Sequence, residues 1–237
     1  TSALLVCVFT MRARFNVSGI FQESFMSQNP VLLLIDVQQG FQDAAYWGGG
    51  RNNPQAEVVC ARLLQHWRER GLPVFHVCHA STNPQSPLHP DNPGFAFAPG
   101  LAPRPEEAVI RKQVNSAFIG TDLQARLDAA AIRALVIAGI STDHCVSTTT
   151  RMAANLGYRV RLVSDGCATF TRYGADGTAY DSELIHQTAL ASLHGEFAEV
   201  LKRRQDTSMV RPGVFQEFGG STPRVYFVEK FDAGSGE

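Results

Sequence analysis

Long apolar runs and an excess of one charge are both missing from this sequence. No apolar stretch approaches the roughly 20 residues that a transmembrane helix needs. The 21 lysines and arginines are balanced by 22 aspartates and glutamates, which gives a formal net charge of -1. Nucleic acids and anionic membranes attract proteins with a strong basic field, and this chain has none. We therefore expect neither a nucleic-acid partner nor a membrane partner.

A disulfide framework is absent as well. The chain has five cysteines, an odd number, and they are scattered at Cys7, Cys60, Cys78, Cys145 and Cys167. This pattern fits a reducing compartment, so we expect a cytoplasmic protein. Internal repeats and low-complexity blocks are also lacking. With 44% hydrophobic and 18% charged residues, the composition is that of a globular chain long enough for one α/β domain.

The first 25 residues have no feature of a core element. The apolar stretch Leu4 to Phe9 is too short for a secretory signal, and no small-residue cleavage site follows it. Met26 lies directly before the first strong strand pattern, and we expect it to be the native start. The expected organisation is an N-terminal extension outside the core over 1–25, a single domain over 26–205 and a C-terminal tail over 206–237.

Short apolar segments alternate with helical patterns from residue 31 onward. The first of them, VLLLID over 31–36, is continuously apolar up to its final acid, as is typical of a parallel strand covered on both faces. The alternation predicts a three-layer αβα fold of the Rossmann or flavodoxin type, with a mainly parallel sheet of roughly six strands. The predicted strands are 31–36, 73–78, 108–111, 134–138, 159–163 and 197–201, and the predicted helices are 54–70, 122–130, 144–156 and 181–193.

One segment joins the end of a buried strand to a cysteine. The strand Ala134 to Ala138 is followed by Gly139, which we expect to end it. Thr142 and Asp143 offer side-chain oxygens that can cap the next helix. Cys145 then falls in the first helical turn, where free N–H groups can hold an oxyanion. The helix dipole also favours a thiolate there, so we expect a depressed pKa for this thiol.

Three chemically useful side chains lie at or just past the carboxyl ends of predicted strands: Asp36, Lys112 and Cys145. A parallel sheet gathers these ends along one edge, where α/β proteins bind their ligands. Asp36 could act as general base and acid, and Lys112 could hold the other two groups in their charged forms. Each has an ordinary alternative, as a turn cap, a solvated lysine or a small buried hydrophobe. The coincidence of all three favours a catalytic site.

These segments resemble the isochorismatase-like cysteine hydrolases. The matching motifs are LLIDVQQGF around Asp36, KQVNSAFIGTDL from Lys112, GISTDHCV ending just after Cys145, and DGCATF over 165–170. The helix around His186 also fits, and the similarity covers about residues 28–202. The resemblance assigns the domain over 26–205 to this type of hydrolase.

The resemblance implies a site as well as a fold. In the family, the residues matching Asp36, Lys112 and Cys145 form a catalytic triad. The position of Ile140 and Ser141 corresponds to a non-proline cis peptide bond beside an oxyanion hole, for which we expect the N–H groups of Ser141 and Cys145. We also expect a homo-oligomer, either a dimer or a tetramer.

The presence of Cys145 narrows the reaction that the resemblance implies. Family members that open the vinyl ether of isochorismate do not need a thiol, whereas those that cleave amide, lactam, ureido or carbamoyl groups do. We therefore expect a cysteine amidohydrolase that cleaves a C–N bond of a small molecule through a thioester and uses no cofactor. The alternatives are vinyl-ether hydrolysis and a family fold kept without catalysis.

Several aromatic and polar residues near the predicted strand ends are candidates for the substrate pocket. Such walls would suit a flat or cyclic substrate, although any of them could equally be ordinary core residues. They are Gln38, Phe41, Trp47, Phe118, His144 and Phe170.

Two rival sites share parts of these motifs. Cys145 and Arg151 have the Cys-x5-Arg spacing of thiol phosphatases, but the intervening residues include no glycine to form a phosphate loop. A zinc site needs three or four converging ligands. His76, Cys78, His79 and His89 lack the acidic partner and spacing of the nicotinamidase metal site. We therefore expect no metal.

Overall fold

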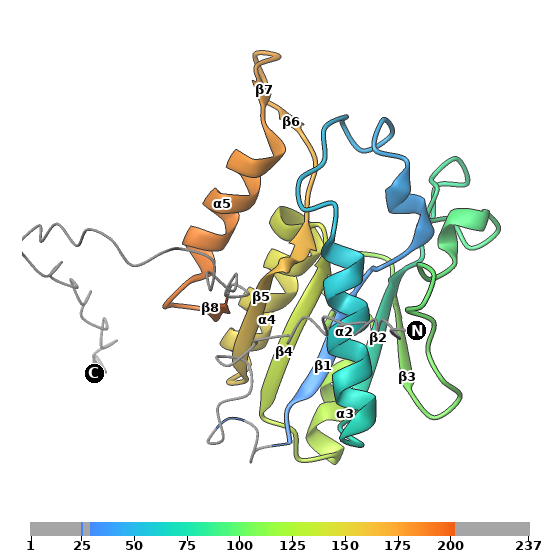
Figure 1. Cartoon of the computed structure of the whole chain (residues 1–237), viewed down its shortest axis with the longest axis vertical. Coiled ribbons are helices and arrows are strands. Elements are labelled where there is room, and N and C mark those ends of the chain that lie inside the picture. Colours follow the sequence, from blue (N-terminus) through green and yellow to red (C-terminus); the bar gives the residue numbers. More distant parts are fainter. Residues whose placement is uncertain (1–24, 26–28, 202–237) are drawn as a thin grey trace, which may run out of the picture. The chain divides into compact units, whose positions relative to one another are not determined.

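The computed structural model describes Phe25 and residues 29–201. Its centre is a sheet of six parallel strands in the order β3-β2-β1-β4-β5-β8 (Figure 1). The predicted mainly parallel sheet of roughly six strands is therefore confirmed. The strands are β1 (Val31–Ile35), β2 (Val74–His79), β3 (Ala108–Lys112), β4 (Ala134–Ile140), β5 (Arg159–Ala168) and β8 (Glu199–Leu201).

Helices cover both faces of this sheet. On one face, α2 (Ala56–Glu69) contributes Val59 and Leu63 to a core with Leu32 and Leu34. On the other face, α3 (Leu123–Ala129), α4 (Ser147–Asn155) and α5 (Ser182–Leu193) share a core with Leu33 and Ile35. Alternate side chains of β1 thus enter opposite cores, which explains why its sequence is continuously apolar. The predicted three-layer αβα arrangement is confirmed (Figure 1).

The ends of β4 and β5 differ from the prediction. Gly139 does not end β4 but lies inside it, at φ +141° and beside a register shift against β5. A Cβ atom at this position would lie 2.0 Å from the Ile35 carbonyl oxygen, so only glycine allows β1 and β4 to approach here. The strand β5 also continues beyond its predicted end at residue 163, as far as Ala168, and takes in Cys167.

Short elements complete the carboxyl edge of the sheet. Two 3-10 turns, η1 (Gln39–Gln42) and η2 (Pro93–Phe95), lie after β1 and within the long connection between β2 and β3. Two backbone hydrogen bonds join this connection to the segment that follows β1. The Ala98 N–H donates to the Val37 carbonyl, and the Gln39 N–H donates to the Ala96 carbonyl. A hairpin of β6 (Arg172–Tyr173) and β7 (Ala179–Tyr180) precedes α5 (Figure 1).

The described residue nearest the N-terminus, Phe25, differs from the predicted organisation. Phe25 was assigned to an extension outside the core, but its side chain is only 2% exposed and packs with the core on the α2 face. The Arg161 guanidinium lies 4.0 Å from its ring centroid, so a cation–π contact adds to the apolar packing. The rest of 1–25 and the tail over 206–237 lie outside the described residues. Within those that are described, no helix has the length and apolarity to cross a membrane.

Candidate active site

The three residues predicted at strand ends meet at the carboxyl edge of the sheet. Asp36 directly follows β1, Lys112 is the last residue of β3, and Cys145 lies in the turn after β4. Lys112 Nζ is 2.6 Å from Asp36 Oδ2 and 3.2 Å from Cys145 Sγ. The side chains of Asp36 and Lys112 are fully buried, and Cys145 is only 8% exposed. The attraction between such charges is much stronger here than it would be in water.

The turn that carries Cys145 is not a regular α-helix. It is a single π-helical turn, η3 (Thr142–Val146), in which the Val146 N–H donates to the Ser141 carbonyl, and α4 begins only at Ser147. The peptide bond between Ile140 and Ser141, just before this turn, is cis. The predicted helix start at about His144 is therefore wrong in detail. Cys145 still lies in the first turn after the strand.

The predicted N-caps of this turn are also wrong. Neither Thr142 nor Asp143 caps it, because both side chains have partners from other elements. The Thr142 hydroxyl lies 2.8 Å from His186 Nδ1, and the Asp143 carboxylate accepts a hydrogen bond of 2.8 Å from Arg172 Nε. Burial by itself would raise the pKa of Asp143, but the hydrogen bonds from Arg172 and Thr169 outweigh it and lower the pKa. The turn is thus fixed by long-range contacts.

The thiol of Cys145 does not have the depressed pKa that its place in the sequence predicted. Burial is the largest influence and raises the pKa to about 12, and the negative charge of Asp36 raises it further. Lys112 acts in the opposite direction but does not compensate. The thiol also has a long contact of 3.9 Å, as donor, with Asn115 Oδ1. Cys145 is therefore a protonated thiol at rest.

Three of the predicted pocket residues form one aromatic group. The ring centroids of Phe41 and Trp47 are 4.7 Å apart, and that of Phe170 is 6.2 Å from Phe41 and 6.3 Å from Trp47. Phe41 and Phe170 are buried, and the half-buried Trp47 donates its indole N–H to the Gly40 carbonyl. The structure therefore brings these three residues together beside the carboxyl edge of the sheet.

The other three predicted pocket residues are separate from this group. Gln38 is fully buried, and its side-chain partners among the described residues are backbone atoms: its amide oxygen accepts from the His79 N–H, and its NH2 group donates to the carbonyls of Phe95 and His79. Phe118 stacks on Tyr158 at 5.9 Å, next to the core on the α3 face. The side chain of His144 is 53% exposed, with Arg172 Nη2 at 3.5 Å from its Nδ1.

Known protein families provide a comparison for this chain. The sequence pattern of the family described as "Isochorismatase domain" matches residues 30–205, about three quarters of the chain. The chain belongs to the isochorismatase family. The family is hydrolytic, so the chain is an isochorismatase-like hydrolase.

Individual members of the isochorismatase family cover the same part of the chain. The isochorismatase family protein YrdC of Bacillus subtilis is 44% identical over 180 residues, which are 76% of this chain and 95% of that protein. A crystal structure of an isochorismatase-family protein from Chromobacterium violaceum has a TM-score of 0.72 and 50% identity. That match covers 76% of this chain and 92% of the other.

Some similar members of the family have names that specify a reaction. The streptothricin hydrolase of Streptomyces noursei is 35% identical over 142 residues, which are 59% of this chain and 49% of that enzyme. The maleamate amidohydrolase of Pseudomonas putida is 30% identical over 168 residues, which are 65% of this chain and 79% of that enzyme.

The residues that sequence reasoning missed are those that hold the isochorismatase-type site together. Arg172 bridges Asp143 to the Trp47 carbonyl, and Asn53 Nδ2 contacts His186 Nε2 and donates to two carbonyls of β5. Both residues lie outside the strand-end motifs, and no local pattern marks them. Asn115 could have been found, because it lies three residues after the end of β3.

One group of side chains within the candidate site has the composition of a metal site. Among the described residues, ligand atoms of Asp36, His79 and Cys145 all lie within 4.8 Å of one another. Lys112 Nζ, however, lies 2.6, 3.2 and 3.3 Å from atoms of these same three residues. A metal ion among them would meet the lysine cation at close range, and like charges repel strongly in a buried site. The residues present therefore do not fit a metal.

Metal removal provides the first test of this site. Because Lys112 supplies the positive charge among the three candidate ligands, we expect prolonged treatment with a chelator, followed by dialysis, to leave the rate of hydrolysis unchanged. Elemental analysis of the untreated protein is the matched measurement. Stoichiometric zinc, together with activity that is lost on chelation and restored by zinc alone, would contradict this expectation.

The rival phosphate loop does not form in the structure. Residues 147–155 are α-helix, so Arg151 lies one to two turns beyond Cys145. Its guanidinium donates to the Ser192 hydroxyl at 2.9 Å and lies 4.5 Å from the Phe197 ring centroid. Arg151 thus contacts the end of α5 and the residues that follow it, and these contacts do not place its guanidinium beside the Cys145 thiol.

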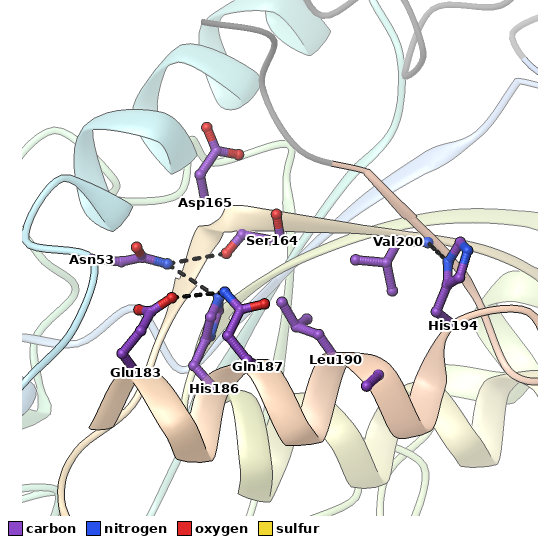
Figure 2. Close-up of a pocket in the computed structure, with 10 residues that line it drawn as sticks. Asn53, Ser164, Asp165, Glu183, His186, Gln187, Leu190, His194 and Val200 are labelled. Carbon is purple, nitrogen blue, oxygen red and sulfur yellow. Dashed lines mark hydrogen bonds between the residues drawn. The ribbon is translucent and has the colours of Figure 1, made fainter. Parts of the chain in front are cut away.

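A cleft lies between α5 and the part of β5 that contains Ser164 and Asp165 (Figure 2). Its volume is about 360 Å³, and Asn53 and His186 lie in contact at one end of it. None of the three triad residues lines it. The lining residues are Asn53, Ser164, Asp165, Glu183, His186, Gln187, Leu190, Ala191, His194 and Val200.

Proposed function

We propose that this hydrolase cleaves a C–N bond of a small molecule through a thioester on Cys145. The observation that carries the proposal is the buried contact of Lys112 Nζ with both Cys145 Sγ, at 3.2 Å, and Asp36 Oδ2, at 2.6 Å. A thiol, a carboxylate and a fixed cation are the parts that nucleophilic catalysis on a carbonyl carbon requires. The substrate group would be an amide, lactam, ureido or carbamoyl group.

The first step moves one proton and forms one bond. With the thiol pKa raised to about 12, only about one molecule in 10⁵ carries a thiolate at pH 7. The proton therefore has to leave sulfur as the attack occurs, and Asp36 is the carboxylate within reach of the thiol. Sulfur bonds to the carbonyl carbon, the carbonyl oxygen takes the negative charge, and the proton moves to Asp36. The N–H groups of Ser141 and Cys145 would hold the oxyanion.

The later steps return the site to its starting state. Asp36 gives its proton to the leaving nitrogen, the C–N bond breaks, and an amine or ammonia departs from the thioester. A water molecule then attacks the thioester carbon while Asp36 accepts its proton. When the C–S bond breaks, that proton passes back to sulfur and the acid product leaves. Lys112 stays charged throughout and balances the charge that moves between Asp36 and Cys145.

The named relatives support this reaction class. A streptothricin hydrolase and a maleamate amidohydrolase are 35% and 30% identical to the chain. The aromatic group of Phe41, Trp47 and Phe170 is suited to form one wall of the substrate pocket, with His144 and Phe118 as further candidates. Gln38 would act there through the backbone that it fixes. A homo-oligomer also remains part of the proposal.

A screen for the released nitrogen tests the proposal. Purified protein is incubated with matched sets of amides, lactams, ureides and carbamoyl compounds, and ammonia or amine is measured. We expect turnover in at least one set, and a covalent adduct on Cys145 in rapidly quenched samples analysed by mass spectrometry. Isochorismate serves as the vinyl-ether comparison. Turnover of isochorismate alone, without an adduct, would overturn the thioester, and no turnover of any compound would favour a non-catalytic role.

A further inference from the structure

The ammonium group of Lys112 has a third neighbour that the proposed reaction does not use. Besides Asp36 and Cys145, Lys112 Nζ lies 3.3 Å from His79 Nδ1. An ammonium group has three N–H donors and no acceptor, so the imidazole nitrogen in this contact must accept. Nδ1 is therefore unprotonated, and the proton of a neutral His79 is on Nε2. The three N–H groups of Lys112 then have one acceptor each.

The backbone of His79 is held as firmly as its side chain. His79 is the last residue of β2 and pairs with Lys112 across the sheet. Its N–H donates to the Gln38 amide oxygen at 2.8 Å, and its carbonyl accepts from Gln38 Nε2 at 3.3 Å. Gln38, which we expected in the pocket, therefore fixes the residue beside it. This arrangement fixes the backbone from which the imidazole extends to Lys112.

The other ring nitrogen is left for a partner from outside the chain. Among the described residues, His79 Nε2 has no hydrogen-bond partner, although the side chain is half-buried. A ring nitrogen of His79 also lies within 4.8 Å of both Cys145 Sγ and an Asp36 oxygen. The imidazole therefore borders the reacting atoms, and its Nε2–H, which has no partner among the described residues, is available to an acceptor of a substrate bound there.

We propose that His79 is the fourth side chain of the reacting centre: Nδ1 positions Lys112, and the Nε2–H donates to an oxygen acceptor of the substrate. This inference rests on the proposed C–N hydrolysis. It narrows the substrate class to compounds that present an oxygen acceptor to this N–H, either on the carbonyl that is attacked or beside the scissile bond.

Protonation of His79 would remove the acceptor that Lys112 uses. Three groups face the imidazole: Lys112 on β3, Asp36 after β1 and Cys145 in η3. Burial, followed by the positive charge of Lys112, lowers the pKa of His79, and Asp36 opposes this only in part. His79 is therefore neutral above its lowered pKa. Its contribution to catalysis should persist into mildly acidic solution and be lost only as the pH falls through that pKa.

Two substitutions separate the roles of the two ring nitrogens. His79→Asn keeps an oxygen acceptor near the position of Nδ1 but has no donor at Nε2, so we expect kcat close to wild type and KM raised about tenfold. His79→Leu lacks both, so kcat should also fall, by about ten- to a hundredfold, because a buried lysine N–H loses its acceptor. His66→Asn, on the surface side of α2, is the matched control and should change neither constant.

An NMR titration tests the tautomer without any substrate. In protein labelled with ¹⁵N-histidine, His79 should be the neutral Nε2–H tautomer at pH 7. Lys112→Met should raise its pKa, because Lys112 lowers it, while His66 should titrate as before. An Nδ1–H tautomer, or a His79 pKa that does not respond to Lys112→Met, would overturn the inference even if C–N hydrolysis is found. Wild-type constants for His79→Leu would overturn it as well. If only the substrate screen fails, the NMR titration still decides whether His79 Nδ1 accepts from Lys112.

Discussion

Replacement of Cys145 by alanine is expected to abolish C–N hydrolysis while leaving the fold intact. Alanine has no nucleophile, so no thioester can form, and loss of the nucleophile in a comparable triad lowers kcat on the order of 10⁶-fold. The substitution removes one small, nearly buried sulfur and leaves the Asp36–Lys112 pair in place. The free energy of unfolding should therefore fall by only about 1 kcal/mol. Steady-state kinetics and denaturant titration measure the two effects.

Cys167→Ala is the matched control for this experiment. Cys167 is also fully buried, and burial raises its pKa to about 12, as it does for Cys145. It differs in its surroundings, because it lies within β5 and its carbonyl accepts from Asn53. The two thiols thus share their burial and their pKa but not the contact with Lys112. Cys167→Ala should keep most of the activity, and a comparable loss in both variants would count against a specific role for Cys145.

Asp36→Asn should lower turnover by about 10²- to 10⁴-fold, because the amide cannot take the thiol proton or return it to the leaving nitrogen. Unlike Cys145→Ala, this change should also destabilise the fold. Lys112 is fully buried at 2.6 Å from the carboxylate, and removal of one partner of a buried ion pair costs about 3–5 kcal/mol. Kinetics at saturating substrate and thermal unfolding measure the two effects.

A double variant separates the two consequences of losing Asp36. In Asp36→Asn/Lys112→Met neither charge remains, so most of the lost stability should return. Activity should stay as low as in Asp36→Asn, because the proton carrier is still missing. Recovery of activity together with stability would mean that Asp36 is needed only to fold the site. Near wild-type turnover in Cys145→Ala, with Asp36→Asn inactive, would instead favour vinyl-ether hydrolysis.

The features that could be predicted from the sequence depend on local patterns repeated along the chain. The apolar segment 31–35 indicates a strand covered on both faces, and the structure confirms it as β1. Parallel strands gather their carboxyl ends, which is why Asp36, Lys112 and Cys145 could be expected together from one sequence. Their roles in catalysis stay predictions, as do the oxyanion hole and the substrate pocket.

The features that could not be predicted depend on contacts between distant residues. Gly139 has the local signature of a strand end, but its neighbour Ile35 comes from another strand, and this contact decides the conformation. Thr142 and Asp143 have the signature of helix caps, but His186 and Arg172 bind their side chains instead. A side chain near a turn takes whichever partner the tertiary structure supplies, and sequence position alone does not identify that partner.

The pKa of Cys145 could not be predicted from the sequence either, because it too depends on residues that are distant in the chain. The position after a strand and in the first turn of a helix predicts a depressed pKa, because the helix dipole is a local effect. Burial by the surrounding core is not local, and here it raises the pKa by more than Lys112 lowers it. The direction of the pKa shift therefore follows from the packing around the thiol.

The separation of the three triad residues in the sequence has a consequence for refolding experiments. Asp36, Lys112 and Cys145 lie at or after the ends of three different strands, and β2 lies between β3 and β1 in the sheet. No helix or hairpin formed alone can bring them together, because parallel strands pair only through long-range chain closure, which is slow. Recovery of turnover after dilution from denaturant would therefore report completion of the sheet β3-β2-β1-β4, and would lag behind signals that detect only helices.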